Sequence, residues 1–354
     1  MMKTKKSMLS LCATGVVAAV LGLTMNSAYS RDLTVVSWGG ASQAAQKKIF
    51  FDGFAKESGH PVLDEAWDGG IGILQSKVKA GNPSWDVVSV EAEELALGCF
   101  DGLFEKIDWA KVGNKEDFIP GAVSECGVGS AVWSMVLAYD GAKYPAGGPS
   151  SWADFWDTQK FPGKRSLRKG PKYTLEFALL ADGVKAADVY KVLATPEGVD
   201  RAFKKLDALK PNIVWWESGA QPLQLLATGE VAMTTSYNGR ITSINETEKR
   251  DFRIVWPGSV YAVDSWVILK GSENKDAAMD FIAFASKPEL MAQIPEFYTY
   301  GLPNKVAAAE VPDRFKPNLP TTSSNLEGAI ALDASFWIDN SEALTQRFNA
   351  WIAQ

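Results

Sequence analysis

Residue types that carry enzymatic chemistry are scarce in this chain: its 354 residues include one His, His60, and three Cys. A Ser-His-Asp triad, a zinc protease motif and a His-rich metal site each need a His at a defined place. His60 follows Gly59 at a predicted turn between a helix and a strand, which is typical of a surface residue. The sequence also has no GxxxxGK[ST] phosphate-binding loop and no GxSxG nucleophile elbow. We therefore expect no catalytic residue, no bound metal and no cofactor.

Aromatic and polar side chains beside the ends of predicted strands are the remaining candidates for chemistry. In open α/β sheets, ligands bind outside the carboxyl ends of the strands. The candidate ligand-binding residues beside these strands are Trp38, Gly39, Ser89, Glu91, Tyr237, Arg240 and Asp264. The sequence thus predicts a ligand site built from rings and charged groups of both signs.

Strands and helices alternate along the chain, which predicts an α/β fold with parallel strand pairing. Strands are expected at 32–38, 85–90, 213–216, 231–235 and 267–269. Helices are expected at 42–58, 70–80, 175–180, 186–193, 199–209, 222–228, 275–285 and 341–353. The composition, 46% hydrophobic and 22% charged, is that of an ordinary globular protein, and the length predicts two domains.

The segment 1–30 has the pattern of a secretory signal peptide. Three lysines precede an apolar run, 8–25, and Ala28 and Ser30 take the small-residue positions of a cleavage site. An uncleaved membrane anchor is the alternative, but the run is short for a membrane span. Cys12 lacks the small preceding residue of a lipoprotein signal. We therefore expect a protein that is exported to the periplasm and soluble there.

The charge of the mature chain argues against nucleic acid as a partner. Without the three lysines of the signal peptide, the 36 basic residues become 33, against 42 acidic residues, so the net charge is about −9. A nucleic-acid-binding protein usually presents a basic face to the phosphates.

Cys99 and Cys126 are the two cysteines that remain after removal of the signal peptide. An even number of cysteines in an oxidising compartment predicts a disulfide between them, with two buried thiols as the alternative. The loop-closure model assigns such a bond about 3–4 kcal/mol. Neither residue has a His or another Cys at the spacing of a metal site.

Several segments of the mature chain together resemble the spermidine/putrescine-binding family, the substrate-binding proteins of ABC importers. Their order and spacing carry the resemblance more than any single motif. The segments are Val36-Ser37-Trp38-Gly39-Gly40, Trp85-Asp86-Val87-Val88, Leu225 to Met233, Val263 to Lys275, and Tyr300-Gly301-Leu302-Pro303-Asn304.

The resemblance implies a type II periplasmic binding protein: two α/β lobes, each with a mixed sheet, and a ligand cleft between them. The partners would be a small amine or amino acid and the membrane permease of an ABC importer, with the binding protein a monomer. Lobe one would comprise 31–138 plus 264–305, and lobe two 139–263 plus 306–354. Crossing segments near 138–140, 262–264 and 304–306 would form the hinge for closure around the ligand.

The resemblance also implies roles for four positions. Trp38, Tyr237 and Tyr300 match aromatic residues of the polyamine site, and Asp264 matches an Asp that takes an ammonium group. Aromatic faces and a carboxylate suit an alkylammonium ion, because cation–π contacts contribute roughly 0.5–2 kcal/mol each and a charge-assisted hydrogen bond adds more.

The sequence departs from the polyamine pattern at three places. The segment 169–173 has no carboxylate for a second amine, Ala262 stands where relatives have a Trp, and Arg240 follows the Asn-Gly turn. An Arg would repel a dication but pairs well with a carboxylate. We therefore expect a dipolar pocket for an ω-amino acid such as 4-aminobutyrate, with Asp264 at the ammonium and Arg240 at the carboxylate.

Several alternatives remain open on the sequence alone. Glu91 offers a second carboxylate, which keeps putrescine or spermidine as a possible ligand. Arg240 could instead be a helix residue that faces solvent. Asp264 could instead cap a helix or form a hydrogen bond in the hinge. A secreted hydrolase would need two carboxylates facing each other across a cleft, and Glu91 and Glu93 lie on one side of an extended segment. A metal-ion binder with two lobes is disfavoured by the single His.

Overall fold

The computed structural model describes residues 31–354, so the predicted signal peptide and Cys12 lie outside the described residues. Asp32–Gln354 form one compact unit. Within this part of the chain, no helix has both the length and the apolar character needed to cross a bilayer.

One mixed sheet runs through this unit, with the strand order β2-β1-β3-β8-β4-β7-β5-β6 and β9 paired to β8. The strands are β1 (Leu33–Ser37), β2 (Val62–Ala66), β3 (Val87–Val90), β4 (Gly127–Asp140), β5 (Arg165–Arg168), β6 (Ile213–Trp216), β7 (Met233–Tyr237), β8 (Phe252–Ile268) and β9 (Ile330–Ala331). The first three strands pair in parallel, as do β5, β6 and β7. The predicted α/β class with parallel pairing is confirmed.

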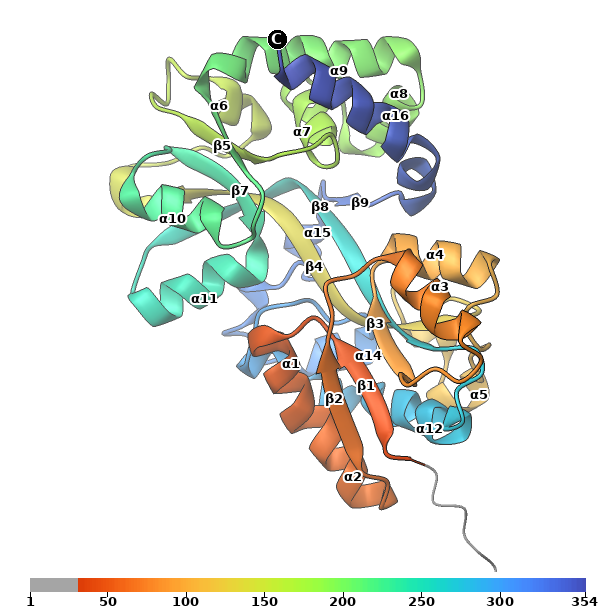
Figure 1. Ribbon diagram of the computed structural model, residues 1–354. Helices are drawn as coiled ribbons and strands as arrows, with labels where there is room; N and C mark the ends of the chain where they lie inside the picture. Colours follow the sequence, from red (N-terminus) through yellow and green to blue (C-terminus); the bar gives the residue numbers. More distant parts are fainter. Residues whose placement is uncertain (1–30) are drawn as a thin grey trace, which may run out of the picture. The chain divides into compact units, whose positions relative to one another are not determined.

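At least one helix follows each of these strands in the sequence (Figure 1). They are α1 (Gly40–Gln46), α2 (Asp52–Ser58), α3 (Ile71–Lys79), α4 (Ala92–Phe100), α5 (Trp109–Val112), α6 (Trp152–Trp156), α7 (Thr174–Ala181), α8 (Val189–Leu193), α9 (Pro196–Leu209), α10 (Gln221–Thr228), α11 (Asn238–Glu248), α12 (Lys275–Ala285), α13 (Pro288–Met291), α14 (Lys305–Glu310), α15 (Ser323–Leu326) and α16 (Ala334–Ile352). A π-helical turn, Lys47–Phe51, joins α1 to α2, so that the predicted helix 42–58 is one continuous helical segment.

The long strands β4 and β8 pair antiparallel and join the two groups of parallel strands (Figure 1). One end of β8 pairs with β3, from Ser265 to Ile268, and the far end of β4 pairs with β7, from Met135 to Tyr139. The two expected mixed sheets are therefore continuous with each other. The register shifts twice along β4, between Gly129 and Ala131 and between Met135 and Leu137.

Two predicted strands differ in extent from the observed ones. The strand expected at 267–269 is only the end of β8, so that Asp264 lies within a strand instead of before it. The strand expected at 231–235 begins at Met233 and continues to Tyr237, because Tyr237 pairs with Met135 in β4. Short apolar runs mark the buried part of such strands, but long-range pairing determines where the strands end.

A separate apolar core supports each group of parallel strands. One core contains Phe50, Phe54 and Phe281 beside β1, and the other contains Phe177 and Trp337 from α7 and α16. Helix α9 shows how the sequence builds the second core. The buried side chains of α9 are one, three or four positions apart and lie on one face: Val199, Ala202, Phe203, Leu206 and Leu209.

Local signals determine where the helices of this core begin. Thr195 accepts a hydrogen bond from the backbone N–H of Gly198 at 3.0 Å, and Pro196 occupies the first turn of α9. Asp333 caps α16 in the same way, so this helix begins seven residues before the predicted start at 341. The ion pair of Arg347 with Asp200, at 2.7 Å, then links α16 to α9.

The predicted disulfide between Cys99 and Cys126 is present, and the alternative of two thiols is wrong. It joins the last turn of α4 to the residue before β4, closing a loop with a sequence separation of 27. The bond therefore ties α4, which follows Glu91, to the long strand that crosses the sheet.

Replacement of both cysteines, Cys99→Ser with Cys126→Ser, should lower the free energy of unfolding by about 3 kcal/mol, because the unfolded chain regains the entropy of the open loop. Guanidinium unfolding of the variant and of the oxidised wild type measures the difference. Equal free energies of unfolding would contradict this role of the bond.

Candidate ligand-binding site

Trp38 and Ser89 meet at the carboxyl ends of the neighbouring strands β1 and β3, as the strand-end rule predicts. The indole Nε1–H of Trp38 donates to the Ser89 hydroxyl at 3.1 Å. The indole also stacks on Trp67, with ring centroids 5.2 Å apart. Trp67 in turn donates to the Ser89 carbonyl at 3.0 Å. The orientation of the Trp38 ring is thus set by a hydrogen bond at its edge and a ring on its face.

Gly39 lies directly before α1, and its backbone N–H donates to the side-chain oxygen of Gln43 at 2.9 Å. Its φ of 69° is in the left-handed region, which a glycine adopts without strain. Gly39 therefore serves the turn that follows Trp38.

Asp264 is 5% exposed, and its Oδ1 accepts a hydrogen bond at 2.9 Å from the indole Nε1–H of Trp133. Burial raises the pKa of Asp264 well above its usual range, and the negative charge of Glu91 raises it further. The alternative of a helix cap is wrong, because Asp264 lies inside β8 next to the register shift between Gly129 and Ala131.

Glu91 is the residue before α4, and its backbone N–H donates to the Glu94 carboxylate at 3.1 Å. Burial raises the pKa of Glu91 from 4.5 to about 7. The positive charges of Lys172 and Arg168 act against this rise, whereas Glu94 and Glu93 add to it. Glu91 and Asp264 are therefore two close carboxyl groups in a poorly solvated place.

Tyr237 ends β7, and its ring lies edge-on to that of Trp133, with centroids 5.3 Å apart. Burial raises the pKa of Tyr237, while the charges of Arg168 and Arg240 lower it. The same phenol is also affected by the charges of Glu91 and Asp264. Tyr237 therefore lies within electrostatic reach of groups of both signs.

Tyr300 approaches the start of α11 because residue 239 is a glycine. A Cβ atom on Gly239 would lie 2.6 Å from the Tyr300 ring, which is closer than real contacts allow. The Asn238 side chain donates to the Thr299 carbonyl at 2.6 Å and accepts from the backbone N–H of Ser134 at 3.0 Å. Asn238 thus holds the segment with Tyr300 against both β4 and α11.

Arg240 lies in the first turn of α11 and is exposed. Its guanidinium lies against Gly219, where a Cβ would come within 2.9 Å of Nε. The charge of Arg240 nevertheless lowers the pKa of both Tyr237 and Tyr300, which burial raises. In residues 31–354, no carboxylate forms an ion pair with Arg240, so its charge is available to a ligand.

The sequence analysis missed Trp133 and Arg168. Trp133 pairs in register with Ala262, so that an indole from β4 lies beside the position where polyamine binders were expected to carry a Trp. Arg168 ends β5, which was not predicted as a strand, and its guanidinium lies 5.8 Å from the centre of the Tyr173 ring. Had β5 been recognised, the strand-end rule would have identified Arg168.

These residues come from strands, helix starts and a loop that are distant in the sequence. The carboxyl groups of Asp264 and Glu91, the guanidinium of Arg240 and the rings of Tyr237 and Tyr300 interact electrostatically. Rings and carboxylates are suited to an alkylammonium group, and guanidinium groups to a carboxylate. The arrangement can therefore hold a small ligand that carries both charges.

Metal chemistry finds no support in the described residues, where no three His, Cys, Asp or Glu side chains come together in the manner of a metal site. His60 is exposed beside a turn, in agreement with its expected surface position.

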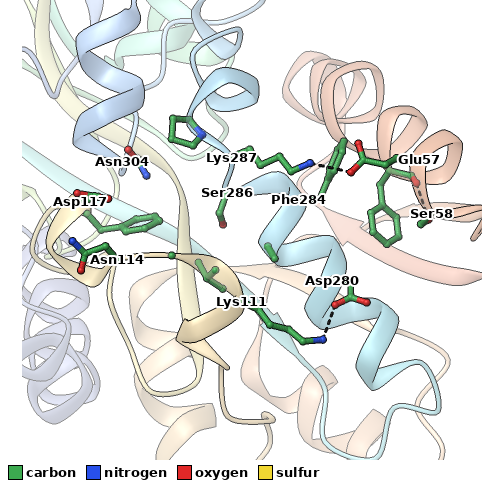
Figure 2. A pocket seen from close by; sticks show the side chains of 16 residues that line it. Glu57, Ser58, Lys111, Asn114, Asp117, Asp280, Phe284, Ser286, Lys287 and Asn304 are labelled. Atoms are coloured by element: carbon green, nitrogen blue, oxygen red, sulfur yellow. Dashed lines mark hydrogen bonds and ion pairs between the residues drawn. The ribbon is translucent and has the colours of Figure 1, made fainter.

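A separate cavity of about 620 Å³ lies near α2, α5 and α12 (Figure 2). None of the candidate ligand-binding residues lines it. The cations at its rim are paired with acids: Lys111 with Asp280 at 2.7 Å, and Lys287 with Glu57 at 3.0 Å. The cavity therefore offers no unpaired guanidinium or ammonium for a charged ligand.

The raised pKa of Glu91 predicts how stability depends on pH. A carboxyl group that binds its proton more tightly when folded makes the protein less stable as the pH rises from 4.5 to 7. Without ligand at pH 7, the free energy of unfolding of Glu91→Gln should be higher than that of the wild type by up to about 3 kcal/mol, because the Gln side chain does not ionise. Below pH 4.5 the two proteins should be equally stable.

Urea unfolding at both pH values measures this difference, and Glu217→Gln, at an exposed glutamate, is the matched control. Equal stability of Glu91→Gln and the wild type at pH 7 would contradict the buried position of this carboxyl group.

Comparison with known proteins identifies the family. Residues 60–321 match the family model of bacterial extracellular solute-binding proteins. The gamma-aminobutyric acid-binding protein of Pseudomonas aeruginosa is 54% identical over 327 residues, 92% of each chain. The spermidine/putrescine-binding periplasmic protein of Escherichia coli K12 is 21% identical over 299 residues, 82% of this chain and 83% of the relative.

A solved structure, the Atu4243–GABA receptor, has 36% sequence identity and a TM-score of 0.80, and the match covers 91% of this chain and 98% of the receptor. The resemblance drawn from the sequence is thereby confirmed. The chain belongs to the family of bacterial extracellular solute-binding proteins.

Proposed function

We propose that this protein binds a short ω-amino acid of the 4-aminobutyrate type and delivers it to the membrane permease of an ABC importer. The observation that carries the proposal is the contact of the Trp133 indole with both the Asp264 carboxylate and the Tyr237 ring, whose phenol is also affected by the charges of Arg168 and Arg240. The 54% identical relative that is named a gamma-aminobutyric acid-binding protein supports the choice of ligand.

The ammonium end of the ligand would lie at Asp264 and Glu91, beside the rings of Trp38 and Trp133. A ligand cation stabilises the ionised form of a buried carboxyl group, so binding would bring Asp264 back toward its usual pKa. The indoles of Trp133 and Trp38 both hydrogen-bond to the Asp264 carboxylate, and the ligand ammonium would add a charged partner to it.

The carboxylate end would lie at Arg240 and Arg168. Neither guanidinium forms an ion pair with an acid of residues 31–354, although surface arginines such as Arg253 and Arg347 do. An arginine presents paired N–H donors that match the two oxygens of a carboxylate.

Putrescine or spermidine is the second candidate ligand. The three glutamates at the start of α4 favour it, as do relatives named for these amines at 21–25% identity. Two guanidinium groups beside the same rings disfavour a ligand that carries only positive charge.

Closure of two lobes, 31–138 plus 264–305 and 139–263 plus 306–354, would enclose the ligand. The long strands β4 and β8 supply two of the proposed crossings, and the third lies near Asn304, which caps α14. The proposal includes export to the periplasm with removal of 1–30, action as a monomer, and no catalytic turnover.

Isothermal titration calorimetry of the purified protein with 4-aminobutyrate and with putrescine tests the function. We expect one 4-aminobutyrate per chain, and putrescine bound at least about a hundredfold more weakly, a difference of about 3 kcal/mol. Tight binding of putrescine together with no response to 4-aminobutyrate would contradict the proposed ligand.

Arg240→Ala and Arg168→Ala should each weaken 4-aminobutyrate binding by about 2–3 kcal/mol, because each removes a charged hydrogen bond to the ligand carboxylate. Arg253→Ala, at an exposed arginine paired with Asp251, is the matched control and should bind as the wild type does. If both site variants bind 4-aminobutyrate with the affinity of the wild type, the two guanidinium groups do not bind the ligand carboxylate.

A further inference from the structure

Glutamates crowd the place proposed for the ligand ammonium. Glu91, Glu93 and Glu94 lie at or within the first turn of α4, and the charge of Glu91 reaches Asp264. Both oxygens of Glu94 are engaged by backbone N–H groups, those of Gly70 and Glu91, each at 3.1 Å. Glu91 in turn accepts the backbone N–H of Glu94 in the same capping box, so Glu93 is the one of these three acids whose carboxylate has no backbone hydrogen bond within the described residues.

Lys172 is the base that forms an ion pair with this cluster, and the charge of Arg168 also acts on Glu91. The Lys172 ammonium forms an ion pair with Glu93, and the two side chains are only 25% and 18% exposed. In the described part of the chain, no other base forms an ion pair with any of these three glutamates. The charge of Lys172 also lowers the pKa of Glu91, against the effect of burial.

The backbone around Lys172 holds its side chain in this place. Pro171 and Tyr173 on either side are buried, and Tyr173 adopts a φ of 70°, which is rare for a residue with a side chain. The Tyr173 ring lies edge-on to Trp133, the donor to Asp264, with centroids 6.1 Å apart. Lys172 is thus presented beside the ligand site by a constrained segment.

We propose that the ammonium of Lys172 takes the place that the second ammonium of a diamine would occupy, and so makes the site selective for ligands with a single amine. This inference rests on the proposed function and adds the residue that determines its selectivity. A diamine would bring a second positive charge toward an acidic cluster that Lys172 already neutralises. An ω-amino acid brings its second charge to the guanidinium groups instead. Like-charge repulsion against the wrong ligand is an effective source of specificity.

Lys172→Met tests the inference, because it removes the charge and keeps the length of an apolar side chain. We expect putrescine to bind at least about tenfold more tightly than it binds to the wild type, by calorimetry at one salt concentration. Lys172→Arg keeps the charge and should not gain putrescine affinity. Unchanged putrescine binding in Lys172→Met would overturn the inference.

Two further variants separate charge from structure. Lys169→Met is the matched control on the same segment, since Lys169 pairs with Glu217 at 2.7 Å and both are exposed, and it should bind putrescine as the wild type does. Adding Glu93→Gln to Lys172→Met removes the acid that the lysine neutralises, and should abolish the gain. A gain in Lys169→Met, or one that survives Glu93→Gln, would contradict the inference.

Thermal melting shows whether each variant is folded. If Lys172→Met is not folded, Lys172→Gln is tested in its place. Titration of the wild type with 4-aminobutyrate distinguishes a failure of the proposed function from a failure of the role proposed for Lys172. Failure of the wild type to bind 4-aminobutyrate overturns the proposed function. Binding of 4-aminobutyrate by the wild type, with no gain of putrescine in the folded Lys172 variants, overturns this inference alone.

Discussion

The buried carboxyl group of Asp264 is the constraint on which the site depends. It lies in the long strand β8, is nearly inaccessible to water, and receives hydrogen bonds from the indoles of Trp133 and Trp38. A charge in such a place is unfavourable until a cation joins it. The raised pKa of Asp264 reflects the cost of this buried charge, and a bound ammonium group would offset that cost. In the proposed function, this poorly solvated acid is the group that receives the cationic end of the ligand.

The two long strands explain how this group is presented. The register of β4 and β8 places Trp133 opposite Ala262 and the Asp264 side chain beside a register shift. In this position the indole of Trp133 contacts Asp264 and the Tyr237 ring together. The same strands join both groups of parallel strands, so the fold and the site share their central element.

Much of the fold and about half of the site could be predicted from the sequence. Buried β-branched runs identified β1, β3, β6 and part of β7, and the strand-end rule found Trp38, Ser89, Glu91 and Tyr237. The paired cysteines identified the disulfide. These features are local, or follow from the compartment, and need no knowledge of which distant segments pair.

The residues that sequence analysis missed depend on long-range pairing. Trp133 is one of 13 tryptophans, and only the register of β4 against β8 brings it to Asp264. Arg168 ends a strand of four residues with two arginines, which no hydrophobic pattern reveals. The role proposed for Lys172 depends on its ion pair with Glu93, which is 79 positions away in the sequence.

A crystal structure of the protein with 4-aminobutyrate bound is the most direct test of the central claim. The account predicts the ligand nitrogen within hydrogen-bonding distance of Asp264 or Glu91, and the ligand carboxylate within that distance of Arg240 or Arg168. A ligand bound in the opposite direction, or in the cavity lined by Phe54 and Phe118, would contradict it.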